Sequence, residues 1–198
     1  FSLKPSLSEK DRINPSDFEL VHKVKKGASN YYFEVIERHT DRLFLAKFLS
    51  KNKNGNNGIY NQYLLNFTNE YNIISKVNHP AIIKYIGFSP NGFCQKHQPA
   101  LLIELAPHGS LNKIIQASKD DQNAFKLNDT QKLINIYGIA NGMSYLHKNN
   151  VIHRNLTPSH ILESENYYPI ISNFSDAYVL KDDEDNYIQP GGIYKNAL

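Results

Sequence analysis

The stretch that decides the fold is GMSYLHKNNVIHRNLTPSHIL, residues 142–162. It begins as the end of an apolar helix, turns through KNN (148–150), and continues as two short apolar runs, VIH (151–153) and HIL (160–162). The residues between these runs are mostly polar and include a proline, which predicts a loop. A polar loop held between short extended segments next to a long helix is a common place for functional side chains.

Helices and further short strands are predicted around this loop. The stretch NDTQKLINIYGIANGMSYLHKNN (128–150) predicts a long helix that Asn128 or Asp129 caps. We expect its buried face to consist of Leu133, Ile136 or Tyr137, Ala140, Met143 or Tyr145, and Leu146. GSLNKIIQAS (109–118) predicts a short helix that begins with Ser110 as its N-cap, and YPIIS (168–172) predicts another extended run.

The first half of the chain is rich in alternating, β-type patterns. The predicted elements are strands at 18–24, 31–39, 42–50, 81–89 and 99–106, with a helix at 61–78. Five strands with one helix, followed by helices, is not an alternating βαβ order. We therefore predict an α+β fold in which a small antiparallel sheet lobe precedes a helical lobe.

Composition excludes several classes of protein. The 198 residues carry a net charge of only +3, and no block of Lys and Arg predicts binding to nucleic acid. The single cysteine, Cys94, excludes an intramolecular disulfide framework, and its pairing with His97 alone is a poor zinc site. No apolar run has the length of a membrane span, and the first residues lack a signal-peptide core, so we expect a cytoplasmic protein without membrane contact.

Four segments with the right order and spacing resemble the eukaryotic protein kinase fold. They are SKVNHPAIIKYIGF (75–88), LLIELAPHGSL (101–111), the stretch at 142–162, and ISNFSDA (171–177). The resemblance is strongest to the tyrosine-kinase-like group of serine/threonine kinases. His153 precedes Asn173 by 20 residues, which is the separation expected between the catalytic-loop His and the metal-binding Asp of that family.

The resemblance implies a two-lobed domain over roughly residues 18–198. It divides the chain into a polar leader (1–17), the N-lobe and hinge (18–106), and a partial C-lobe (107–198) that ends in the activation segment. A complete domain of the family runs well beyond 198 residues, so we expect a truncated C-lobe, from a fragment or a shortened protein. The apolar face of the 128–147 helix is then expected to be partly exposed and to favour partner binding.

Part of the family's ATP-binding apparatus is retained. Lys47 matches the Lys that holds the ATP phosphates, and Glu70 matches its ion-pair partner on the following helix. Gly27 is the one glycine kept from the glycine-rich loop, and Glu104 and Ala106 match hinge positions.

The surfaces that sandwich adenine in the family are altered. Lys25 and Asn30 replace the outer glycines of the phosphate loop, whose small size lets backbone amides approach phosphates. Tyr32 stands where the family has a Val against adenine, and Leu45 stands where it has an Ala. We expect Tyr32 and Leu45 to occupy part of the nucleotide pocket, so that ATP binding is impaired.

The residues that carry phosphoryl transfer are all replaced. Asn155 stands in place of the catalytic Asp, and Thr157 stands in place of the Lys that neutralises the transferred phosphoryl group. The two magnesium positions hold His160 and Asn173, and neither supplies the carboxylate that a hard cation favours. We therefore predict that magnesium is not bound. Asp176 is the nearest carboxylate that could compensate.

The chain keeps the residues that match the family's hydrophobic spine and gatekeeper, although the residues that match its catalytic positions are replaced. Ile74, His153 and Phe174 match the hydrophobic spine, and Ile103 matches the gatekeeper. The leading hypothesis is a pseudokinase that acts as a signalling or scaffold module through protein partners. The alternatives are a weakly active serine/threonine kinase that transfers the ATP γ-phosphate to protein, and a fragment or gene remnant of such a kinase.

The activation segment lacks its usual phosphorylation switch. No Ser or Thr occurs between Asp176 and Leu198, and Arg154 is the family's phosphate receiver. We hypothesise that the acidic run DDED (182–185) docks on Arg154 instead; the alternative is a solvated acidic loop.

Overall fold

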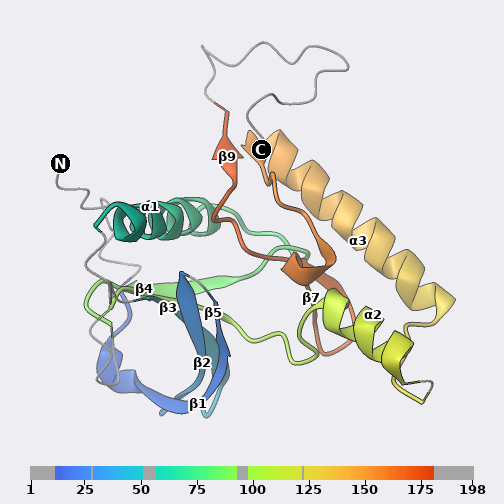
Figure 1. The fold of residues 1–198 in the computed structure, drawn as a ribbon, viewed down its shortest axis with the longest axis horizontal. Coiled ribbons are helices and arrows are strands. Elements are labelled where there is room, and N and C mark those ends of the chain that lie inside the picture. The colour runs from blue at the N-terminus through green and yellow to red at the C-terminus, as the bar shows by residue number, and fades with distance from the viewer. Residues whose placement is uncertain (1–11, 28, 51–56, 93–97, 122, 181–198) are drawn as a thin grey trace. The chain divides into compact units, whose positions relative to one another are not determined.

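The computed structural model describes residues 12–27, 29–50, 57–92, 98–121 and 123–180 (Figure 1). The chain divides into two compact units, one formed by Phe1–Asn78 with Ile83–Pro107 and the other by His79–Ile82 with His108–Leu198. The Cys94 and His97 pair, the acidic run 182–185 and the last residues 191–198 lie outside the described ranges. Within the described ranges, no helix is long and apolar enough to cross a membrane.

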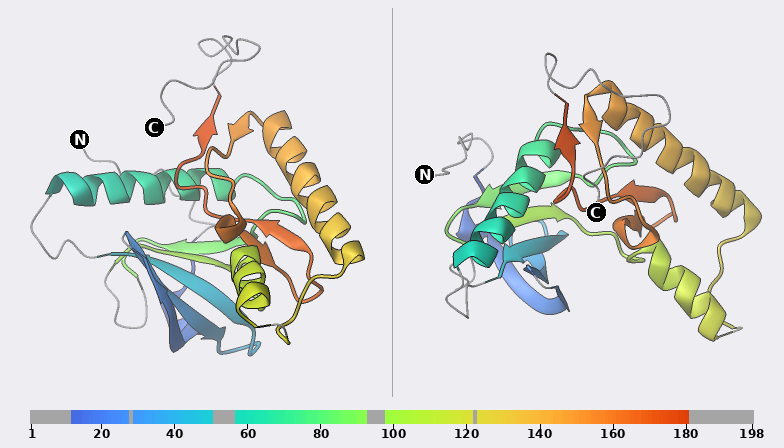
Figure 2. Two further views of the ribbon diagram at one scale, coloured as in Figure 1. Left: turned by 45° about the vertical axis from the view of Figure 1, so that its right-hand side comes forward. Right: turned by 45° about the horizontal axis from the view of Figure 1, so that its top comes forward.

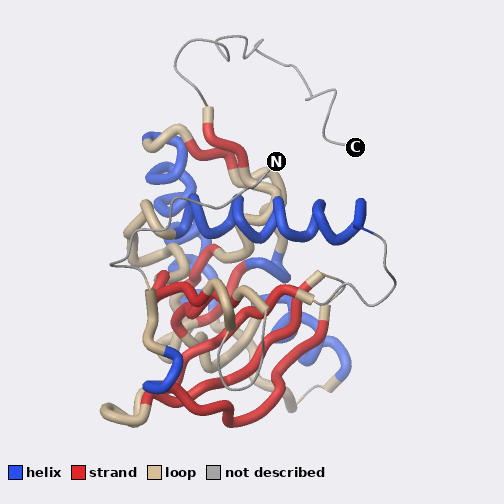
Figure 3. Tube along the Cα trace, turned by 90° about the vertical axis from the view of Figure 1, so that its left-hand side faces the viewer, coloured by secondary structure: helices blue, strands red, loops and turns tan. Residues whose placement is uncertain are grey.

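The first unit is a five-stranded antiparallel sheet with one helix. Its strands follow the order β1-β2-β3-β5-β4, so the last two strands in the sequence exchange places. The elements are the short 3-10 helix η2 (Pro15–Asp17), β1 (Phe18–Lys26), β2 (Asn30–Glu37), β3 (Leu43–Leu49), α1 (Asn57–Ile74), β4 (Tyr85–Ser89) and β5 (Ala100–Glu104). This architecture confirms the predicted antiparallel sheet of five strands, and α1 lies along one side of it (Figure 3).

Alternation along β3 explains how the unit is built. Phe44, Ala46 and Phe48 point to one face, where they join a core that β1, β2 and β5 complete. The ring of Tyr31 stacks on Phe48 with centroids 5.4 Å apart. Lys47 points to the opposite face, the side on which α1 contacts the strand.

Two predicted boundaries in this unit were wrong. The helix begins at Asn57 and ends at Ile74, where the chain leaves the helix in turns that Ser75 and Lys76 close. The fourth strand begins at Tyr85 rather than at 81, because residues 79–82 turn away and belong to the second unit.

The described part of the second unit contains two α-helices, a 3-10 helix and short antiparallel ladders (Figure 2). Its elements are α2 (Leu111–Asp120), α3 (Asp129–Lys148), β6 (Val151–Ile152), the 3-10 helix η3 (Pro158–His160), β7 (Ile161–Glu163), β8 (Pro169–Ile171) and β9 (Tyr178–Val179). Ser110 caps α2 as predicted, because its side chain accepts a hydrogen bond from the Lys113 amide. Asn128 caps α3 in a reciprocal capping box with Gln131.

The predicted buried face of α3 was wrong for most of its residues, whereas the expected partial exposure of the apolar face is confirmed. Leu133 and Ile136 are each 67% exposed, Tyr137 is 74% exposed and Ala140 is exposed, whereas Leu146 is buried as expected. The helix instead turns Asn135, Gly138 and Gly142 toward the hairpin formed by β7 and β8. A Cβ on Gly138 would lie 2.5 Å from Pro169 Cγ, and one on Gly142 would lie 2.8 Å from Ile171 Cδ1. Glycine therefore permits a close approach between helix and hairpin that the larger apolar residues would prevent.

Candidate functional site

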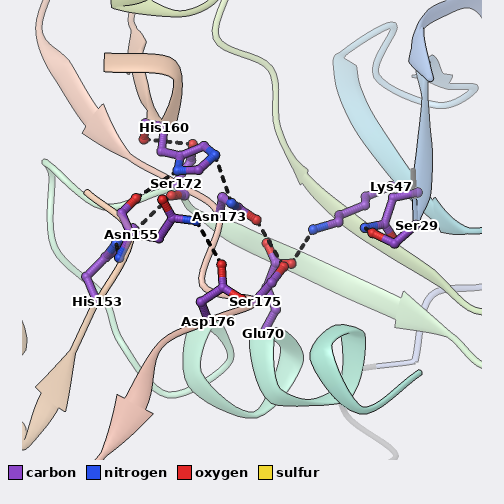
Figure 4. A network of polar contacts seen from close by, with 11 residues as sticks. Ser29, Lys47, Glu70, His153, Asn155, His160, Ser172, Asn173, Ser175 and Asp176 are labelled. Carbon is purple, nitrogen blue, oxygen red and sulfur yellow. Dashed lines mark hydrogen bonds and ion pairs between the residues drawn. The ribbon is translucent and has the colours of Figure 1, made fainter. Parts of the chain in front are cut away.

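The first unit contains a buried ion pair. Lys47 on β3 donates to Glu70 Oε2 on α1, and the two residues are 2% and 3% exposed (Figure 4). Burial alone would lower the pKa of Lys47, but Glu70 and Tyr32 outweigh it and the pKa is raised. The pair predicted from the sequence is thus formed, with Lys47 charged and held away from water.

Tyr32 is directed at this ion pair. It lies opposite Lys47 in the β2–β3 register, and Lys47 Nζ is 5.8 Å from the centre of its ring. Burial raises the pKa of the Tyr32 phenol, and Lys47 partly opposes that rise. The ring therefore lies at the lysine that would hold the nucleotide phosphates. Leu45, half-buried, lies opposite the buried Ile103 in the β3–β5 register.

The remaining nucleotide positions of this unit keep ordinary backbone geometry. The Gly27 amide donates to the Asn30 carbonyl at 2.7 Å, and neither Lys25 nor Asn30 takes a positive φ. Glu104 closes β5, where its Oε1 accepts a hydrogen bond from the Lys84 amide at 2.7 Å, and Ala106 beyond it is buried. Glu104 is therefore the last residue of β5, and Ala106 lies two residues beyond the strand.

In the second unit, His153 anchors the polar loop between β6 and η3. Its imidazole is fully buried, donates from Nε2 to the Ser172 carbonyl at 3.0 Å, and accepts at Nδ1 from the Asn155 amide. Its ring lies edge-on to Phe174 with centroids 5.0 Å apart. Both predicted spine residues of this unit are therefore buried and in contact.

His160 joins the two remaining loop positions. Its Nδ1 lies 2.8 Å from the Asn155 carbonyl oxygen and its Nε2 lies 3.0 Å from Asn173 Nδ2 (Figure 4). A carbonyl only accepts hydrogen bonds, so Nδ1 carries the proton and Nε2 of the neutral ring accepts from the Asn173 amide. Ser175 then donates to Asn173 Oδ1 at 2.9 Å, and Ser172 donates to the His160 carbonyl.

Asp176 supplies the carboxylate of this network. Its Oδ2 accepts a hydrogen bond from Asn155 Nδ2 at 2.8 Å, and its carbonyl accepts one from Arg154 Nε. The guanidinium of Arg154 also lies over the ring of Tyr178, with 5.5 Å between Cζ and the ring centre. Asn155 therefore acts as a donor where the family's Asp would accept a proton.

Two residues of this network have a costly backbone conformation. Arg154 and Asn173 have φ values of 59° and 64°, in the left-handed region that residues other than glycine seldom adopt. Asn tolerates this region better than most residues. The hydrogen bonds of Arg154 to Asp176 and of Asn173 to His160 hold these two turns.

The residues at the two metal positions do not fit magnesium. Magnesium requires hard oxygen ligands in octahedral geometry, but His160 offers a nitrogen that already accepts a hydrogen bond from Asn173. Asn173 Oδ1 is occupied by Ser175. Across the described ranges, no group of three or more His, Cys, Asp or Glu side chains is placed to hold a metal ion.

Thr157 takes no part in the network. Its side chain is exposed and makes no capping hydrogen bond to η3, although its carbonyl accepts one from the His160 amide. Ser172 was not identified from the sequence, and Ser175 was identified only as the residue in place of the family's Gly after Phe174. Ser172 directly precedes Asn173 and Ser175 lies two residues after it, which is the signal that could have assigned them to the network.

Comparisons with known proteins define the family. Residues 44–194 match the family described as protein tyrosine and serine/threonine kinase. The match covers most of the chain, from β3 onward, so the chain belongs to this protein kinase family.

Individual relatives agree with this assignment. A probable leucine-rich repeat receptor-like protein kinase of Arabidopsis thaliana is 29% identical over 65% of this chain and 11% of its own length. A probable serine/threonine-protein kinase of Dictyostelium discoideum is 27% identical over 82% of this chain and 12% of its own length. A rust resistance kinase of Triticum aestivum is 37% identical over 54% of this chain and 17% of its own length. The chain thus spans less than a fifth of these three relatives.

Proposed function

We propose that this chain is a pseudokinase that works in signalling by binding protein partners and transfers little or no phosphate. One observation carries the proposal: the hydrogen bond between His160 Nε2 and Asn173 Nδ2, which joins the two side chains that would have to bind metal. Because phosphoryl transfer depends on positioning and charge neutralisation, loss of the metal ions removes most of the catalysis.

The other substitutions support the same conclusion. The amide of Asn155 has no basicity to accept a proton, and it donates to Asp176. Thr157 carries no charge at the position where the family's Lys would neutralise the transferred phosphoryl group. Each missing electrostatic group commonly lowers a rate by about 10²–10³-fold, so several together leave little activity.

The retained elements support a role for the kinase shape. The buried Lys47–Glu70 pair, the contact of His153 with Phe174, and the left-handed turn at Asn173 are each intact. These features shape the chain without performing the reaction. The partners that we propose are proteins, since the small net charge gives no basis for binding nucleic acid.

Thermal melting with ATP tests the proposal. The melting temperature should show no shift that depends on magnesium, because the metal positions are closed to it. The matched control is the double variant His160→Asn, Asn173→Asp, which restores two oxygen ligands and should gain a magnesium-dependent shift if nucleotide can enter. A wild-type shift that requires magnesium would overturn the proposal. A shift with ATP alone would identify a pseudokinase that binds nucleotide.

A weakly active serine/threonine kinase is the second candidate, and Asp176 is the observation that favours it. Its Oδ2 lies 2.8 Å from Nδ2 of Asn155, the residue that stands in place of the family's catalytic Asp. If Asp176 takes over as the base, phosphate transfer to protein should be measurable and should fall when Asp176 is changed to Asn. Equal transfer by both proteins would remove this candidate.

A further inference from the structure

A carboxylate is buried in the β7–β8 hairpin of the second unit, away from the loop network. Glu163, the last residue of β7, is 0% exposed, and its partner Asn135 on α3 is 4% exposed. Asn135 Nδ2 lies 3.4 Å from Glu163 Oε2 and also donates to the carbonyls of Gln131 and Tyr167. This is a polar pair inside a part of the fold that otherwise packs apolar and glycine residues.

Both side chains have one oxygen without a hydrogen-bond partner among the described residues. The two atoms are Glu163 Oε1 and Asn135 Oδ1. Leaving a buried acceptor unpaired is costly, and a buried unpaired charge costs more. A carboxylate cannot relieve this, because it is an acceptor at both oxygens. A carboxylic acid can, because its O–H donates to the amide oxygen while its other oxygen accepts from the amide nitrogen.

The surroundings do not offer a counter-ion instead. The titratable groups on and next to the elements packed against β7 are Lys113, Lys119 and Asp120 on α2, His160 on η3, Glu165, Tyr167 and Tyr168 in the hairpin turn, His108 before α2, and Asp129, Lys132, Tyr137, Tyr145, His147 and Lys148 on α3. No side chain of these described residues hydrogen-bonds to Glu163. Burial raises the pKa of Glu163 to about 7, partly opposed by the Asn135 hydrogen bond.

We propose that Glu163 and Asn135 form a proton-binding site, in which one proton on Glu163 closes an acid–amide pair and stabilises the second unit. The proton is shared between two side chains 28 positions apart, and the pair ties several segments together. The Glu163 amide donates to the Gly109 carbonyl at 2.8 Å, and Asn135 donates to Tyr167 across the hairpin. Loss of the proton therefore loosens contacts among α3, the hairpin and the start of α2.

The direction of the pH effect follows from proton binding. Between about pH 4.5, the ordinary pKa of a Glu, and about pH 7, the folded chain holds a proton that the unfolded chain has released. The folded state binds more protons in this window, so stability falls as pH rises through it and then levels off. Uptake of the proton near neutral pH makes the site a pH-sensitive element of the fold.

The test compares the full chain with Glu163→Gln as a function of pH. Gln can form both hydrogen bonds with Asn135 without a proton, so it imitates the protonated acid at every pH. The melting temperatures of the two proteins should be similar near pH 5, and the variant should be increasingly more stable up to about pH 7.5. Glu165→Gln is the matched control, because this neighbouring carboxylate is exposed, and its difference from wild type should not change with pH.

A second measurement does not depend on unfolding. Infrared spectra near pH 6 should contain a carboxylic-acid carbonyl band that is present in wild type and absent in Glu163→Gln. If a buried water or a cation satisfied the two oxygens, Glu163 would stay ionised. In that case the acid band would be missing and the stability difference would not change with pH, and either result overturns the proposal.

Discussion

Removing Lys47 should destabilise this protein strongly, even though the lysine has no catalytic role in a pseudokinase. Lys47→Met removes the cation of a buried ion pair from beside Glu70, and both side chains are almost completely excluded from water. Breaking a buried ion pair from one side typically costs about 3–5 kcal/mol. We expect a loss of that size in the free energy of unfolding.

The double variant Lys47→Met, Glu70→Met separates an ion pair from simple packing. Replacing both partners by apolar residues of similar volume removes two desolvation costs together, so the double variant should be much closer to wild type than Lys47→Met. The assay is equilibrium urea unfolding followed by circular dichroism, since the chain has no tryptophan. Lys132→Met is the control, because its exposed pair with Asp129 should contribute little.

Two outcomes would refute this reasoning. A loss of less than about 1 kcal/mol for Lys47→Met would mean that Glu70 is solvated or has another counter-charge. A double variant as unstable as the sum of the two single variants would mean that the residues act independently.

Three further changes test other parts of the structure. Tyr32→Val removes the ring that lies at Lys47 and should tighten ATP binding in calorimetry; unchanged affinity would show that the ring does not obstruct a nucleotide. Gly138→Ala should lower the melting temperature although Ala favours helices by about 1 kcal/mol, because the new Cβ would lie 2.5 Å from Pro169; a higher melting temperature would disprove the close approach. Asn128→Ala removes the capping box of α3 and should cost about 1 kcal/mol in urea unfolding, whereas no change would show that the cap is dispensable.

Local patterns predicted the elements of this fold well because each pattern reports on short-range physics. Alternation defined the strands of the sheet, and the cap predicted at Asn128 or Asp129 placed the start of α3 to within one residue. The sequence did not predict which face of α3 is buried. Its largest apolar residues, Leu133, Ile136 and Tyr137, suggested a buried stripe, but Gly138 and Gly142 form the contact with the hairpin. Periodicity cannot distinguish the face that packs closely from a second apolar face.

For the candidate site, the sequence identified the residues but not the contacts between them. Alignment to the family identified Asn155, His160 and Asn173, and the structure brings these three together through hydrogen bonds. Alignment could not show that their side chains bind one another, because that depends on the tautomer of His160 and the orientation of an amide. The pairing of Glu163 with Asn135 left no signal in the sequence at all, since the two residues are distant in the chain and each is ordinary for a surface.

The most direct test of the central claim is transfer of labelled γ-phosphate from ATP to protein, measured with and without magnesium. The account predicts that wild-type protein transfers no more label than Lys47→Met prepared in parallel, and that adding magnesium changes nothing. Transfer that rises with magnesium, and that is lost in Lys47→Met under conditions where circular dichroism shows the variant to be folded, would contradict this conclusion and show a working kinase.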